Sequence, residues 1–175
     1  GLLQKQLLEE SLEMKQAVHG DRDHPGIAAT LHELGIVSHW AGDLEQAKLQ
    51  LGMSLRMNRR VHADRDHPDV AADLHELGIV SCLAGDLEEA KQLLEESLEM
   101  KQAVHGDRDH PGIAATLHEL GIVSHWAGDL EQAKLQLGMS LRMNRRVHAD
   151  RDHPDVAADL HELGIVSCLA GDLEE

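Results

Sequence analysis

The sequence has few of the residues that usually anchor a protein core or cross-link a small domain. Its 175 residues include no phenylalanine, no tyrosine, two tryptophans and two cysteines. A core must therefore be built from Leu, Ile, Val, Ala and Met. Cys82 and Cys168 make no disulfide framework, so we expect free thiols and a reducing, intracellular (cytoplasmic) setting.

Positive charge is also scarce, because 16 basic residues face 32 acidic ones and the formal net charge is −16. Such a balance disfavours nucleic acid and anionic membrane surfaces, both of which attract basic proteins. The apolar runs are too short to span a bilayer, and no signal-peptide pattern opens the chain. Apolar residues still make up 42% of the sequence, enough for a continuous core.

The sequence repeats itself with two periods. Residues 5–89 recur without a change as 91–175, and residues 20–62 match 63–105 at 28 of 43 positions. Self-similarity at a period of about 20–50 residues is the signature of a solenoid. The identity of the two long copies indicates a recent duplication or an engineered array. The expected division is a lone second helix at 1–19, three repeats at 20–62, 63–105 and 106–148, and an incomplete repeat at 149–175.

Each repeat is predicted to hold two helices. Pro25 suits a first helical position, and the first helix is expected to run from about Pro25 to Trp40, with counterparts near 68–83, 111–126 and 154–169. Gly42 suits the end of that helix, and the second helix continues to about His62, with counterparts near 86–105 and 129–148.

Two local features of the second helices carry further expectations. Asp43 and Gln46, like Asp86 and Glu89, have the spacing of a capping box, in which the aspartate accepts a backbone N–H. Gly52 inside a helix costs about 1 kcal/mol relative to alanine, so it is expected to mark a close helix approach.

These features together resemble a tetratricopeptide repeat. The residues that carry the resemblance are Leu77-Gly78, Gly85-Asp86-Leu87, Ala90, Leu94 and Leu98, at the spacing of that motif. The long period and the stretch Asp66-His67-Pro68-Asp69-Val70-Ala71 are similar to the roughly 42-residue variant of kinesin light chains and nephrocystin-like proteins. The resemblance implies an all-α, right-handed α-solenoid of stacked antiparallel helix hairpins, which serves non-catalytic protein–protein interaction.

The resemblance also implies a concave peptide-binding groove lined by the first helices. Its candidate residues in the first 86-residue unit are His32, Ile36, His39, Trp40, His75, Ile79, Cys82 and Leu83. The same positions in the second unit are His118, Ile122, His125, Trp126, His161, Ile165, Cys168 and Leu169. Two readings of Trp40 and Trp126 are open: anchors for a bound peptide, or side chains packed between neighbouring repeats.

Other chemistry has weaker support in the sequence. His32 and His39 share a helix face, but three or four converging ligands are needed for a metal site, and position 36 is not the second histidine of an H-E-x-x-H motif. Asp21 and Asp23 resemble the start of a calcium loop that lacks its closing glutamate. No nucleophile–base pair is indicated beyond Cys82 near His75, so we predict no enzyme, no cofactor and no metal.

The two ends of the array give a second hypothesis, self-assembly into dimers or end-to-end filaments. Stacked repeats bury each other's apolar faces, and no polar cap is evident at either end. The candidate self-association residues are Leu2 and Leu3 at the start and Leu160 and Leu163 in the last first helix. A peptide partner of so acidic an array should be basic or neutral and apolar. Fourteen histidines also predict lower stability or altered assembly near about pH 5.

Overall fold

The computed structural model describes residues 1–106 and 108–171, and this part of the chain folds into eight α-helices without a strand. Their bounds are α1 (Leu2–His19), α2 (Pro25–Trp40), α3 (Leu44–Val61), α4 (Pro68–Leu83), α5 (Leu87–His105), α6 (Pro111–Trp126), α7 (Leu130–Val147) and α8 (Pro154–Ala170). All eight lie close to the positions expected from the sequence. None of these helices combines the length and apolarity needed to cross a bilayer.

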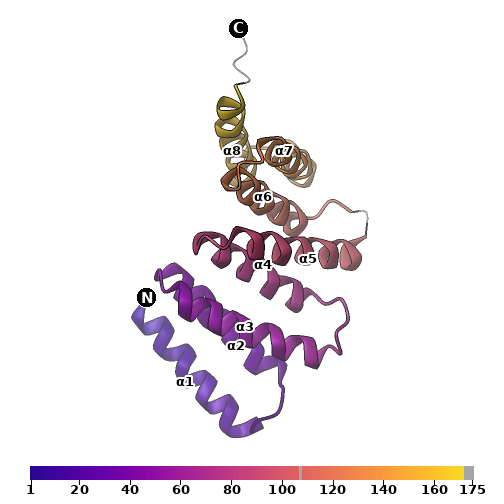
Figure 1. Cartoon of the computed structure of the whole chain (residues 1–175). Helices are drawn as coiled ribbons and strands as arrows, with labels where there is room; N and C mark the ends of the chain where they lie inside the picture. The colour runs from indigo at the N-terminus through magenta and orange to yellow at the C-terminus, as the bar shows by residue number, and fades with distance from the viewer. Residues whose placement is uncertain (107, 172–175) are drawn as a thin grey trace.

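The helices form a stack of antiparallel hairpins. α2 packs on α3, α4 on α5 and α6 on α7, and each second helix also packs on the first helix of the following repeat. α1 packs on α2 in the same way. α1 and α8 therefore lie at opposite ends of the stack, and the chain is an all-α solenoid (Figure 1).

The core runs along the stack instead of gathering at one centre. Leu51 of α3 clusters with Leu74 and Val80 of the next repeat, and Leu94 of α5 clusters with Leu120 of α6. Burying a side chain of this size contributes about 1.5–3 kcal/mol, so each repeat depends on its neighbours for much of its stability.

The two helices of a hairpin approach most closely at the glycine of each Leu-Gly pair. A Cβ atom on Gly35 would lie 2.5 Å from Cγ of Leu51, and one on Gly78 would lie 2.5 Å from Cγ of Leu94. The expectation for Gly52 is wrong, because a Cβ there would meet only the guanidinium of Arg56, at 3.6 Å. The close approach belongs to the first helix of each hairpin.

The helix starts use histidine and aspartate as caps. Nδ1 of His24 accepts the N–H of Gly26 at 3.0 Å, and the histidines before α4, α6 and α8 act in the same way. Asp43 accepts the N–H of Gln46 at 3.1 Å, as the capping box predicts. The same expectation for Asp86 is wrong: its side chain caps nothing and instead lies 2.9 Å from Nζ of Lys48 in the preceding repeat.

Candidate protein-interaction groove

The first helices line the inner side of the stack. α2 contacts α4, α4 contacts α6, and α6 contacts α8, whereas no such contact joins α1 to α3, α3 to α5 or α5 to α7 in the described part of the chain. First helices thus lie closer together than second helices, and the stack curves towards them. The helices that carry the predicted groove residues lie on this side.

Two shallow pockets open between consecutive first helices on this side. The pocket between α2 and α4 has a volume of about 220 Å³, and its lining includes Ala29, His32, Glu33, Ala72 and Asp73. Its counterpart between α6 and α8 has a volume of about 180 Å³. They are too small for a folded domain and suit single side chains of an extended or helical segment.

A buried carboxylate lies beneath the first of these pockets. Oδ1 of Asp73 lies 2.7 Å from Nδ1 of His32, and Oδ2 accepts hydrogen bonds from Nδ2 of Asn58 at 2.8 Å and Oγ of Ser54 at 3.0 Å. Burial acts to lower the pKa of His32, but the hydrogen bond and charge of Asp73 outweigh it and raise that pKa. The same network joins His118 to Asp159.

The intervening junction, between the second and third repeats, has different chemistry. Thr116 takes the place of the buried aspartate, its hydroxyl lying 3.1 Å from Nδ1 of His75, and it accepts a hydrogen bond from Nζ of Lys101 at 2.8 Å. Burial, helped by the charge of Lys101, lowers the pKa of His75 to about 3, so this histidine is neutral at physiological pH. Burial also lowers the pKa of Lys101 to about 8. The junctions therefore alternate between a histidine–carboxylate pair and a neutral histidine.

A column of four glutamates runs along the groove, one after each of these histidines: Glu33, Glu76, Glu119 and Glu162. Burial raises the pKa of Glu119, and the charges of Glu76 and Glu162 raise it further against the opposing effect of His118. The ion pairs found in the described residues join none of the four to a lysine or arginine; Nδ1 of His39 lies 4.0 Å from Oε2 of Glu76, and Nδ1 of His125 lies 4.0 Å from Oε2 of Glu162. These glutamates place negative charge on the inner side of the stack, and the cationic groups of the chain that act on them include Lys101, near Glu76, and His118, near Glu119.

The predicted groove residues differ in exposure. The half-buried ones are His32, Ile36, His39, His75, Ile79, His118, Ile122, His125 and Ile165. The exposed ones are Trp40, Leu83, Trp126, His161, Cys168 and Leu169. Trp40 is 81% exposed and Trp126 is 53% exposed, so neither residue is buried between repeats.

Cys82 does not line the groove, and its prediction as a groove residue needs correction. Its side chain is buried and clusters with Ala90, Leu94, Leu120 and Val123, where the second and third repeats meet. Burial raises the pKa of the Cys82 thiol and keeps it unreactive.

Sequence reasoning missed Asp73, Asn58 and their counterparts in the second copy. The available signal was the exchange of Thr30 for Asp73 at an inward position of otherwise matching helices. It also missed two groups that each combine two histidines with an aspartate, at the starts of α4 and α8.

The first of these groups consists of His62, His67 and Asp69. The two imidazole rings stack with their centroids 3.4 Å apart, and Oδ2 of Asp69 lies 3.5 Å from Nε2 of His62. Nδ1 of His67 already accepts the N–H of Asp69 at 3.1 Å, so a metal ion on that nitrogen would displace the helix cap. The group therefore serves the start of α4.

The architecture is that of a helical-repeat scaffold, and comparisons with known proteins define it further. A family model described as tetratricopeptide repeat matches residues 27–103 and again 70–146. The chain belongs to the tetratricopeptide repeat family. Proteins of this family are typically non-catalytic scaffolds for protein–protein interaction.

Solved structures agree with this assignment. A putative kinesin light chain of Podosopora anserina with nearly identical TPR-like repeats is 27% identical, with a TM-score of 0.76 over 97% of this chain and 78% of that one. A variant of the same protein gives 26% identity and a TM-score of 0.78 over the same shares. BtubC from P. vanneervenii, at 20% identity, gives a TM-score of 0.83 over 96% of this chain and 65% of its own, and shows the fold alone. A search of curated proteins found no relative.

Proposed function

We propose that the chain is a non-catalytic scaffold whose inner groove binds an extended or helical segment of a basic, or neutral and apolar, protein partner. The observation that carries this proposal is the glutamate column, in which Glu119 is half-buried and its carboxylate is repelled by those of Glu76 and Glu162. A lysine or arginine of a partner would relieve that repulsion. Charge complementarity of this kind favours the right partner and excludes acidic ones.

Apolar side chains beside the column supply the rest of the binding surface. Trp40 and Trp126 are exposed on first helices, and Ile36 and Ile79 are half-buried. Indole rings in such positions often dominate binding energy because they bury a large area with little loss of side-chain entropy. A partner segment that alternates basic and apolar residues would match both features.

The test is a fluorescence titration with two synthetic peptides of equal length, in which leucines alternate with lysines in one and with glutamates in the other. The lysine peptide should bind, should perturb the emission of the two tryptophans, and should lose affinity with added salt. Stronger binding of the glutamate peptide would contradict the proposal.

A matched pair of variants locates the binding. Glu76→Gln with Glu119→Gln removes two charges from the groove, whereas Glu45→Gln with Glu95→Gln removes two exposed charges from the second helices α3 and α5. Both double variants change the net charge equally. Only the groove variant should weaken the lysine peptide strongly; equal effects would point to general attraction by the acidic chain.

Self-association is a second candidate function, favoured by apolar side chains at both ends of the stack. Leu2 is 82% exposed and Leu3 69% exposed on α1, and on α8 Leu160 is exposed and Leu163 half-buried. Light scattering against concentration tests this candidate. A mass that stays monomeric at high micromolar concentration would contradict it.

A further inference from the structure

The two end helices of the stack are copies of two helices that pack together in its interior. α8 repeats the sequence of α4, and α1 repeats that of α5 from Lys5 onwards. In the interior, α4 and α5 form a hairpin. Within residues 1–106 and 108–171, no second helix follows α8 and no first helix precedes α1.

Side chains that are buried between α4 and α5 are more exposed at the same positions of α8 and α1. Leu74 of α4 is fully buried, whereas its counterpart Leu160 on α8 is 48% exposed. Leu94 of α5 is fully buried, whereas its counterpart Leu8 on α1 is half-buried. Each end therefore presents one half of an interface that the chain already contains in assembled form.

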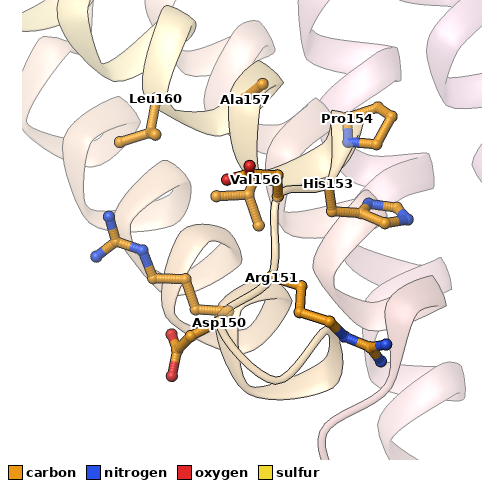
Figure 2. Close-up of a pocket in the computed structure, with 9 residues that line it drawn as sticks. Asp150, Arg151, His153, Pro154, Val156, Ala157 and Leu160 are labelled. Atoms are coloured by element: carbon orange, nitrogen blue, oxygen red, sulfur yellow. The ribbon is translucent and has the colours of Figure 1, made fainter.

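A pocket of about 570 Å³ lies where α8 lacks this partner, lined on one side by Val156, Ala157 and Leu160 and on the other by the loop before the helix (Figure 2). The equivalent interior pocket measures about 320 Å³, and α5 contributes Glu96 and Met100 to its wall. The matching residues of α1 are Glu10 and Met14, and Met14 is exposed.

An ion pair between α3 and α5 crosses the interior pocket, and the counterparts of its two residues lie at the two ends of the stack. Nη2 of Arg59 lies 2.7 Å from Oε1 of Glu96. Arg145, the counterpart of Arg59, lines the pocket beside α8, and Glu10, the counterpart of Glu96, is exposed on α1. A second copy that placed its α1 on α8 would bring this arginine and this glutamate together.

The sharpest complementarity is at Gly164. Its interior counterpart Gly78 is covered so closely by Leu94 that an added Cβ would lie 2.5 Å from Cγ of that leucine. An added Cβ on Gly164 would meet no atom within 4 Å. The space above Gly164 is therefore open where Leu94 covers Gly78, and Leu8 is the leucine that α1 carries at the position of Leu94.

The opposite end of the stack has a cavity of its own. A pocket of about 570 Å³ is lined by α1 together with Ile36, Val37 and Trp40. In the interior, Cys82 packs against Val123, the counterpart of Val37. The exposed Cys168 of α8 is the residue that would take this place in a neighbouring copy.

We propose that α8 of one copy binds α1 of a second copy and so reproduces the α4–α5 hairpin between molecules. This inference rests on the second candidate function and specifies its interface. Gln4 of α1 occupies the position of Ala90 in α5, and Ala90 is fully buried. The part of α1 that matches α5 therefore begins at Lys5. Because the two surfaces differ, the join is head-to-tail and extends into open chains of copies instead of closing into a symmetric dimer.

Gly164→Ala tests the join in the full 175-residue chain. The added methyl has free space in the single copy and favours the helix, but it would collide with Leu8 of the next copy. Gly138→Ala is the matched control, because an added Cβ there meets only Arg142, at 3.6 Å. Sedimentation velocity over a range of concentrations should show growing oligomers for the parent chain and for Gly138→Ala. For Gly164→Ala the association should weaken by about tenfold or more.

A charge exchange gives a second, independent readout. Arg145→Glu should weaken association several-fold by facing Glu10 with a like charge, and adding Glu10→Arg should restore it. Association of Gly164→Ala equal to that of the parent, or no rescue by the double variant, would overturn this interface while leaving self-association standing. A strictly monomeric parent chain would overturn both.

Discussion

Nδ1 of His32 lies 2.7 Å from Oδ1 of Asp73, so the first two repeats are joined by a histidine and a fully buried carboxylate. The other oxygen of Asp73 accepts hydrogen bonds from Ser54 and Asn58. This carboxylate therefore holds three helices together, α2, α3 and α4.

Asp73→Ala should lower the free energy of unfolding by about 3–5 kcal/mol, because it leaves the polar groups of His32, Ser54 and Asn58 buried without their acceptor. Urea unfolding measures the loss. Asp66→Ala, at an exposed position, is the control and should change stability by less than about 0.5 kcal/mol. Equal losses in the two variants would show that the buried network contributes little.

His75 should make the chain less stable as the pH falls. Its pKa in the folded chain is about 3, below the ordinary value of 6.5, so protons bind the unfolded chain preferentially once the pH drops below about 6.5. Thermal melts at about pH 7.5 and pH 5 should show this loss, and His75→Gln should reduce it. A His75→Gln variant that loses as much stability as the parent chain between the two pH values would contradict the prediction.

His32 should respond to pH in the opposite sense. Its pKa is raised in the folded chain by Asp73, so its pairing stabilises the fold fully below about pH 6.5 and is lost as the pH rises through the raised pKa. His32→Gln should therefore cost more stability at about pH 5 than at pH 7.5. The same urea titrations check this, and an equal cost at both pH values would show that the imidazole is not charged in the pair.

The helix pattern was readable from the sequence because its signals are local. Pro25 and Gly42 mark helix ends through their own backbone preferences, and leucines at spacings of three and four mark the buried faces. The family match and the solved structures confirm the tetratricopeptide assignment. The division of the chain into repeats at 20, 63, 106 and 149 stays a prediction.

The polar junctions were not readable, because their partners are far apart in the sequence. His32 and Asp73 are 41 residues apart, and Lys48 reaches Asp86 across 38 residues. Asp86 has the spacing of a helix cap, but the ammonium group of Lys48 lies beside its carboxylate. Cys82 occupies a groove position in the family pattern, yet the third repeat covers it.

Gly78→Ala and Gly52→Ala should change stability in opposite directions. A Cβ on Gly78 would lie 2.5 Å from the branching carbon of the fully buried Leu94, so the substitution should cost about 1–3 kcal/mol. A Cβ on Gly52 meets only a flexible arginine end, so alanine should stabilise α3 by up to about 1 kcal/mol. Urea unfolding of the two single variants checks the signs. A stabilised Gly78→Ala would mean that the hairpin is less tightly packed than the structure shows.

Glu119→Gln should make the chain more stable and a poorer binder at the same time. Burial and the neighbouring carboxylates of Glu76 and Glu162 raise the pKa of Glu119, so its ionised form is disfavoured in the folded chain above that pKa. Removing the charge should raise the free energy of unfolding at about pH 7.5. The gain should shrink as the pH falls and the native glutamate takes up a proton.

The same substitution removes a carboxylate that we expect to meet a basic side chain of a partner, so the lysine–leucine peptide should bind more weakly. Glu95→Gln, at an exposed position on α5, is the control and should leave both quantities nearly unchanged. We expect stability to rise and affinity to fall together, because the repulsion between these glutamates costs stability while their charges attract a basic partner. A Glu119→Gln variant that loses stability and binds the peptide as tightly as before would assign this glutamate a structural role instead.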